Sequence, residues 1–88
     1  MRKYYKQILA AFFRHQIFQT RVHLLDITQE EMAHRMGMST RSYVDLEHRK
    51  SACSAVILAL FLVFVCDDPV KFLEELRYAF ESVGAKAL

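Results

Sequence analysis

The segment from residue 28 to residue 48 constrains the fold most, because it carries signals for two short helices and a tight turn between them. Thr28 and Glu31 match a capping box, in which the two residues satisfy free backbone donors at the start of a helix. Gly37 can adopt the left-handed backbone that ends a helix without a steric penalty. Ser39 is a favourable N-cap for the helix that follows. This segment therefore predicts a helix–turn–helix.

The rest of the chain also favours helices, because its 88 residues contain only two glycines and one proline, and such a scarcity of breakers argues against a turn-rich β fold. Residues 3–25 have apolar side chains at steps of three, four and five, which predicts a long amphipathic helix that ends near Asp26. The whole chain, residues 1–88, is expected to form a single domain.

Two further helices are predicted in the C-terminal half. Ser54 is a favourable N-cap for a helix over residues 55–66. Asp68 followed by Pro69 indicates the start of a fifth helix, since proline is well tolerated at the first helical position. Gly84 is expected to end that helix. Its inward face is expected to comprise Val70, Leu73, Leu76, Phe80 and Val83.

The second helix of the predicted pair begins with small polar and basic side chains, at the place where a DNA-reading helix contacts base edges. Arg41 is suited to bidentate pairing with O6 and N7 of guanine, and Thr40 and Ser42 can bond to bases or phosphates. Asp45 can accept from N4 of cytosine or orient Arg41, one turn earlier. The pattern predicts binding to double-stranded DNA. The alternative is that two helices simply pack together, because the net charge of +2 is a weak argument for nucleic acid.

A set of residues within the segment follows one spacing pattern. They are Thr28, Gln29, Glu30, Ala33, Gly37, Tyr43, Leu46 and Glu47. With this pattern, the chain resembles the DNA-binding domain of the Cro/C1-type, or xenobiotic-response-element, family of bacterial and phage repressors, over roughly residues 18–80. The resemblance implies an all-α, five-helix, lambda-repressor-like fold, here with an extended N-terminal helix.

The resemblance also implies two kinds of DNA contact. Gln29 and the loop after the reading helix would touch phosphates, whereas the start of the reading helix would face bases. The expected DNA-binding residues are Gln29, Ser39, Thr40, Arg41, Ser42, Asp45, His48, Arg49 and Lys50. The chain departs from the family at Arg49, where a glycine is common, and at Cys53, where a proline is common. The loop between the third and fourth helices is therefore expected to differ in shape.

The predicted helix over residues 55–66 has no polar face, although a surface helix normally has one. The family's fold would bury Leu58, Phe61, Leu62 and Val65, which leaves a second apolar face without a partner. Three explanations are open for that face. It could belong to a membrane span, although the apolar run is shorter than the roughly 20 residues that a span needs. It could be covered by the N-terminal helix, or it could form a homodimer interface.

We favour a homodimer, in which the N-terminal extension and the outer face of the fourth helix form one surface. The expected interface residues are Phe12, Val56, Leu60, Val63 and Phe64. Two-fold pairing would present two reading helices to half-sites about 34 Å apart, which predicts a palindromic operator. The alternative function is a protein-interaction module on the same fold, for example an antitoxin-like protein that binds a partner protein.

Nothing in the sequence indicates an enzyme, a metal site or a cofactor. The four histidines lack carboxylate or cysteine partners at ligand spacing,. Asp67 and Asp68 are explained by capping of the fifth helix. Cys53 and Cys66 flank one predicted helix and are expected to lie roughly 20 Å apart, too far for a disulfide, whose Cα atoms lie within about 7 Å. Free thiols are typical of the cytoplasm, which is the expected location.

Overall fold

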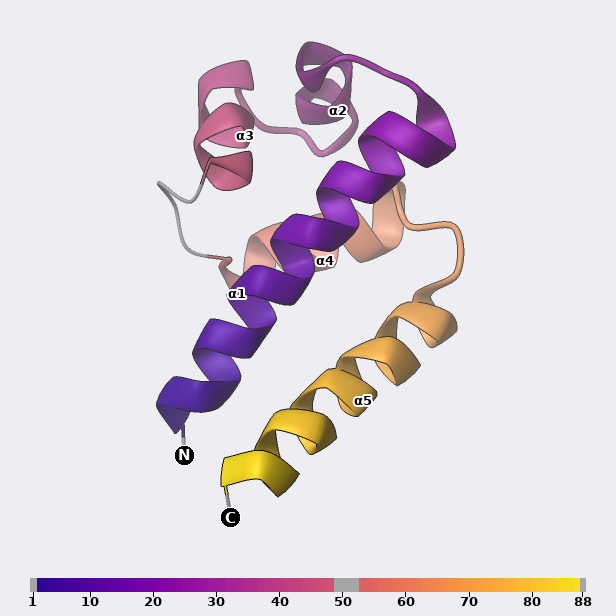
Figure 1. Cartoon of the computed structure of the whole chain (residues 1–88). Coiled ribbons are helices and arrows are strands. Elements are labelled where there is room, and N and C mark those ends of the chain that lie inside the picture. Colours follow the sequence, from indigo (N-terminus) through magenta and orange to yellow (C-terminus); the bar gives the residue numbers. More distant parts are fainter. Residues whose placement is uncertain (1, 49–52, 88) are drawn as a thin grey trace.

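The computed structural model describes residues 2–48 and 53–87, and the surroundings of side chains 5–48 and 53–82. Over the described residues the chain is all-α and forms five α-helices, which confirms the expected fold class (Figure 1). The elements in chain order are α1 (Arg2–Gln19), the π-helical segment η1 (Thr20–Leu25), α2 (Gln29–Arg35), α3 (Thr40–Glu47), α4 (Ala55–Phe64) and α5 (Pro69–Ala87).

Helices α1 and α5 lie antiparallel and side by side, so that the beginning of α1 and the end of α5 meet at one end of the molecule (Figure 1). Aromatic rings join the two helices along their length. The rings of Tyr5 and Phe80 meet edge to face with centroids 5.0 Å apart, and those of Phe12 and Phe72 do so at 5.2 Å. Such pairs add to the stabilisation from buried area, so the N-terminal extension is held mainly by α5.

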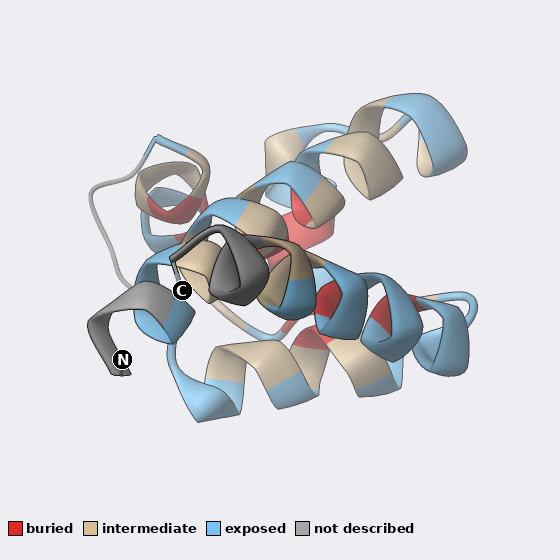
Figure 2. Ribbon diagram, turned by 60° about the horizontal axis from the view of Figure 1, so that its bottom comes forward, coloured by how far each residue is buried: buried red, intermediate tan, exposed pale blue. Residues whose placement is uncertain are grey.

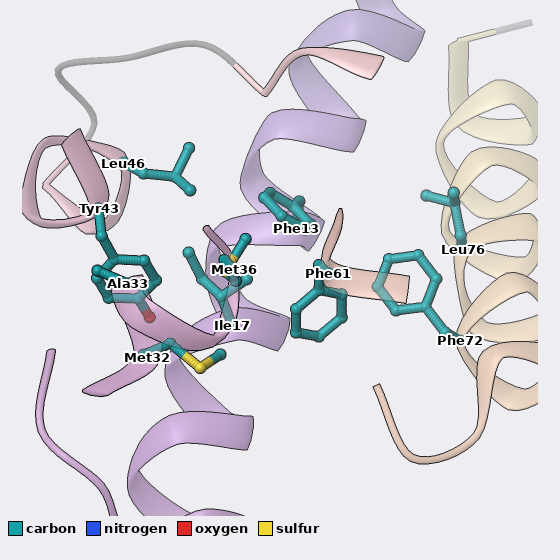
Figure 3. Close-up of a cluster of buried hydrophobic side chains, with 10 residues drawn as sticks. All are labelled: Phe13, Ile17, Met32, Ala33, Met36, Tyr43, Leu46, Phe61, Phe72 and Leu76. Carbon is teal, nitrogen blue, oxygen red and sulfur yellow. The ribbon is translucent and has the colours of Figure 1, made fainter. Parts of the chain in front are cut away.

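Phe61 joins α4 to this pair of helices. Its side chain is 1% exposed and lies between two other rings, 5.4 Å from the centroid of Phe13 on α1 and 5.7 Å from that of Phe72 on α5 (Figure 3). Helices α1, α4 and α5 therefore meet at one aromatic cluster, and the side of α4 that carries Phe61 packs into the core.

The helix–turn–helix packs on the other side of α1, where Ile17 is fully buried. The buried side chains of α2 and α3 are Met32, Ala33, Met36, Tyr43 and Leu46 (Figure 3). The buried residues form one continuous cluster with the aromatic rings, so α2 and α3 share a core with the rest of the chain.

The N-terminal helix ends at Asp26, as predicted, but its last turns are π-helical. Asp26 has a φ of 52°, in the left-handed region, and caps the segment. Its backbone N–H donates to the carbonyl of Arg21, as does that of Ile27, with an N–O distance of 3.0 Å. Asp26 and Ile27, which lead into α2, are therefore both hydrogen-bonded to the same carbonyl of η1.

The prediction for α5 was wrong in two respects. The helix continues past Gly84, because alanine and lysine follow that glycine and both favour a helix. Val70 and Leu73 were expected to face inward, but they are 66% and 52% exposed. Leu76 is buried, as predicted, but Phe72 takes the place of Leu73, since its larger aromatic ring gains more from burial against α1 and α4.

Candidate nucleic-acid interface

The turn between α2 and α3 has the geometry that its sequence predicts. The side chain of Thr28 caps α2, its Oγ1 accepting from the backbone N–H of Glu31 at 3.1 Å. Gly37 has a φ of +68°, and a Cβ built there would meet nothing within 4 Å. The glycine is therefore required by the left-handed backbone rather than by crowding. The N–H of Met38 donates to the carbonyl of Ala33 at 3.0 Å, closing the helix end,.

Ser39 caps α3 and fixes which polar groups remain available on its first turn. Its Oγ accepts from the backbone N–H of Ser42 at 3.1 Å and lies 2.8 Å from the Oγ of the same residue. These two hydroxyls are thus bonded to each other. Thr40 and Arg41 are exposed, and within the described part of the chain Arg41 makes no ion pair. The first turn of α3 therefore presents a hydroxyl and a guanidinium group.

A half-buried polar network holds the other end of α3. The carboxylate of Glu47 accepts from Nε of Arg21 at 2.7 Å and from its Nη2 at 3.1 Å, a bidentate ion pair. Nε2 of Gln29 donates to the same carboxylate at 2.9 Å, and the hydroxyl of Tyr43 donates to it as well. The side chains of Arg21 and Glu47 are only 14% and 6% exposed.

The protonation states follow from these contacts. Burial opposes the charge on Glu47, but hydrogen bonds from Arg21, Tyr43 and Gln29 outweigh it and hold the pKa of the carboxyl below its usual value,. The hydrogen bond to Glu47 raises the pKa of Arg21. Burial and the bond to Glu47 raise the pKa of Tyr43. Near neutral pH, the carboxylate of Glu47 is therefore ionised and paired with the charged Arg21, and Tyr43 is a neutral phenol that donates to that carboxylate.

No family model, curated protein or solved structure matches this chain. Its function must therefore be inferred from the arrangement of its own side chains.

The structure separates the expected DNA-binding residues into three groups. Gln29 is half-buried and donates to Glu47. Asp45, on α3, is also half-buried. The expected residues at the start of α3 and just beyond its end are exposed. The exposed group contains Ser39, Thr40, Arg41, Ser42 and His48. Arg49 and Lys50 lie outside the described residues.

Sequence reasoning missed Arg21, which lies 26 positions before its partner Glu47. Glu47 belongs to the spacing pattern, so a buried carboxylate in need of a cation could have been suspected there. The cation could not be chosen from the sequence, because the π-helical winding of η1 changes which side chains share a face.

An open groove lies between α2 and the start of α3, and its lining is slightly acidic. Its lining residues are Thr28, Glu30, Glu31, His34, Arg35, Met38, Ser39 and Thr40. The lining carries two carboxylates and one arginine, so the groove is a poor cradle for a phosphate group.

The outer face of α4 is a second candidate surface, and it carries no charge. Val56, Val63 and Phe64 are exposed by 68%, 72% and 64%, whereas Leu60 is half-buried. Figure 2 shows the helices coloured by how far each residue is buried. The helix ends at Phe64, two residues earlier than predicted. Among the described residues, no helix is both long enough and apolar enough to cross a bilayer. The N-terminal helix does not cover this face.

Phe12 does not belong to the outer face of α4, although it was expected to form part of the same interface. It is half-buried and packs against Phe72 of its own chain, because α1 runs along α5 rather than over the outer side of α4. A surface on α4 would therefore be built from α4 itself, without the N-terminal extension that we expected to join it.

Proposed function

We propose that this chain is a sequence-specific, lambda-repressor-like transcriptional regulator that reads double-stranded DNA with α3. The main support is the construction of that helix. Tyr43 and Leu46 anchor it in the core, whereas Thr40 and Arg41 on its first turn are exposed. A reading helix needs this division between an anchored side and a free N-terminal turn.

In this proposal, Arg41 pairs with O6 and N7 of a guanine, and Thr40 bonds to a neighbouring base or phosphate. Asp45, one turn further along α3, accepts from N4 of cytosine or orients Arg41. Gln29, at the start of α2, and the loop that begins at His48 bind the DNA backbone on either side, which sets the orientation of α3 without reading sequence.

Replacing Arg41 by alanine should weaken binding to a selected duplex by about 1–3 kcal/mol and relax the preference for one base pair. The reason is the loss of a bidentate contact to a base edge. The matched control is Arg77→Ala on α5, which removes the same charge from an 81% exposed side chain far from α3 in the sequence. Fluorescence anisotropy titrations would measure both, and equal losses for the two variants would contradict base reading by Arg41.

We further propose that two copies bind a palindromic site together. Outside the ion pair of Arg21 and Glu47, α2 and α3 carry more acidic than basic side chains: Glu30, Glu31 and Asp45 against Arg35 and Arg41. One copy therefore gains less from phosphate attraction than two copies on one site, which double the number of phosphate contacts. The uncharged outer face of α4 is suited to a two-fold contact, because an apolar patch is complementary to itself.

Val63→Glu should shift a dimer to monomer, because it places two carboxylates against each other across the two-fold axis. The matched control is Val70→Glu, at a valine of α5 that is 66% exposed, close to the 72% of Val63. Sedimentation equilibrium at micromolar concentration should give a dimer for the parent and the control. A parent protein that sediments as a monomer would remove this part of the proposal.

The same uncharged face supports one alternative function, in which α4 binds a different protein and the chain acts as an antitoxin-like interaction module. The alternative predicts no measurable affinity for duplex DNA at low salt. A regulator predicts affinity that falls steeply as salt rises, so the two functions are separable by one titration.

A further inference from the structure

We propose that Ser42 determines specificity by donating its hydroxyl proton to a base edge, and that Ser39 is the positioning residue that sets the direction of this bond. The acceptors open to Ser42 in the major groove are N7 and O6 of guanine, N7 of adenine and O4 of thymine. This inference rests on the proposed function, since it concerns a side chain on the first turn of the same reading helix.

Two consecutive hydrogen bonds join Ser39 and Ser42. The backbone N–H of Ser42 donates to Oγ of Ser39 at 3.1 Å, and the hydroxyl of Ser39 donates in turn to Oγ of Ser42 at 2.8 Å. A serine hydroxyl has one proton and two lone pairs. The cap therefore uses the single proton of Ser39 within the protein, and Ser39 has none left to donate to DNA.

The hydroxyl of Ser42 is left as a donor. Its Oγ accepts the proton of Ser39, and among the described residues no hydrogen bond uses its own proton. The side chain is exposed, so this proton is available to a ligand at the first turn of α3, in addition to the groups of Thr40 and Arg41. Because hydrogen bonds in a chain polarise one another, a hydroxyl that accepts one bond becomes a better donor of the next.

A donor at this position distinguishes bases by the groups that they present. Cytosine offers only its N4 amino donor in the major groove, so two donors would face each other there, whereas guanine and thymine offer acceptors. The structure therefore predicts selection against cytosine at the base that Ser42 contacts. Arg41, the preceding residue, also carries donors only, so both residues select bases that bear acceptors.

Phosphate oxygens also accept hydrogen bonds, but a bond from Ser42 to a phosphate would carry no sequence information. Ser42 follows Arg41 directly on the exposed first turn of α3, which is where a reading helix meets base edges. The acceptor is therefore assigned to a base rather than to the backbone, and the experiment below separates the two.

The test reverses the direction of the bond between the two hydroxyls without removing the cap. In Ser39→Asp the carboxylate still accepts the backbone N–H, since aspartate is a favourable N-cap, but it has no proton to donate. It therefore accepts the hydroxyl proton of Ser42, whose lone pairs are left for DNA. Ser39→Asn is the conservative variant, because asparagine has the same shape, caps equally well and keeps amide protons that can donate to Ser42.

The readout is the ratio of affinities, by fluorescence anisotropy, for duplexes that differ only at the base pair whose preference Ser42→Ala removes. In the parent protein, an acceptor-bearing base should bind about two- to tenfold more tightly than cytosine, the range that one hydrogen bond supplies. Ser39→Asn should keep this order, and Ser39→Asp should reverse it in favour of cytosine. Ratios within one protein cancel the general loss of affinity that an added negative charge causes.

The double variant Ser39→Asp with Ser42→Ala keeps the carboxylate without the hydroxyl, so a reversal that persists in it would overturn the inference. An unchanged order in Ser39→Asp would do the same. If Ser42→Ala weakens selected and random duplexes equally, Ser42 contacts a phosphate and the inference fails, while the proposed function stands. If the parent protein binds no duplex at low salt, the proposed function fails and the inference fails with it.

Discussion

Replacing Phe61 by alanine is expected to lower the free energy of unfolding by about 3–5 kcal/mol, the range seen when a buried phenylalanine is truncated. The ring is 1% exposed and lies against Phe13 of α1 and Phe72 of α5, so its removal opens a cavity where three helices meet. A domain of this size is stabilised by about 5–15 kcal/mol in total. Urea denaturation followed by circular dichroism would measure the loss.

The matched control is Tyr78→Ala, which truncates an aromatic side chain that is 73% exposed on α5. Surface substitutions of this kind usually change stability by no more than about 0.5 kcal/mol. If both variants unfold at the same urea concentration, then α4 is not joined to α1 and α5 through this ring.

Replacing Glu47 by alanine is expected to cost about 1–3 kcal/mol, because it leaves three buried or half-buried donors without their acceptor. The charge left behind is that of Arg21, 14% exposed, and the hydroxyl of Tyr43 and the amide of Gln29 lose the same acceptor. The control is Glu81→Ala, whose exposed pair with Arg77 is worth about 0–1 kcal/mol. Equal losses for the two alanine variants would contradict the burial of the network.

The same network predicts a dependence of stability on pH. The pKa of Glu47 is lower in the folded protein than its usual value, which is about 4.3 in an unfolded chain. The folded state therefore binds fewer protons than the unfolded state in this range. The stabilisation is present in full above the unfolded pKa and is lost as pH falls through the folded pKa. Denaturation curves from pH 7 to pH 3 should show this loss, and Glu47→Gln should reduce the slope.

Local signals explain why the centre of the chain could be predicted from its sequence. Thr28, Gly37 and Ser39 each act within three to five residues of their own position, through caps and one left-handed backbone. Tyr43 and Leu46 are three apart on a short helix with polar neighbours, so only one face could be buried. The exposed first turn of α3 followed from the same periodicity.

Features that depend on distant partners could not be predicted in this way. In α5 two apolar stripes compete, and the rings of α1 and α4 determine that Phe72, rather than Leu73, faces the core. The pairing of α1 with α5 places Phe12 inside its own chain for the same reason. The ion pair between Arg21 and Glu47 depends on the π-helical winding of η1, for which no sequence signal was recognised.

The central claim is that α3 reads DNA, and the most direct test is a titration of the parent protein with a selected and a random duplex at two salt concentrations. We expect that affinity for both duplexes falls steeply with salt, and that the selected duplex binds at least a thousandfold more tightly. No binding to either duplex at low salt, or equal affinity for both, would contradict it.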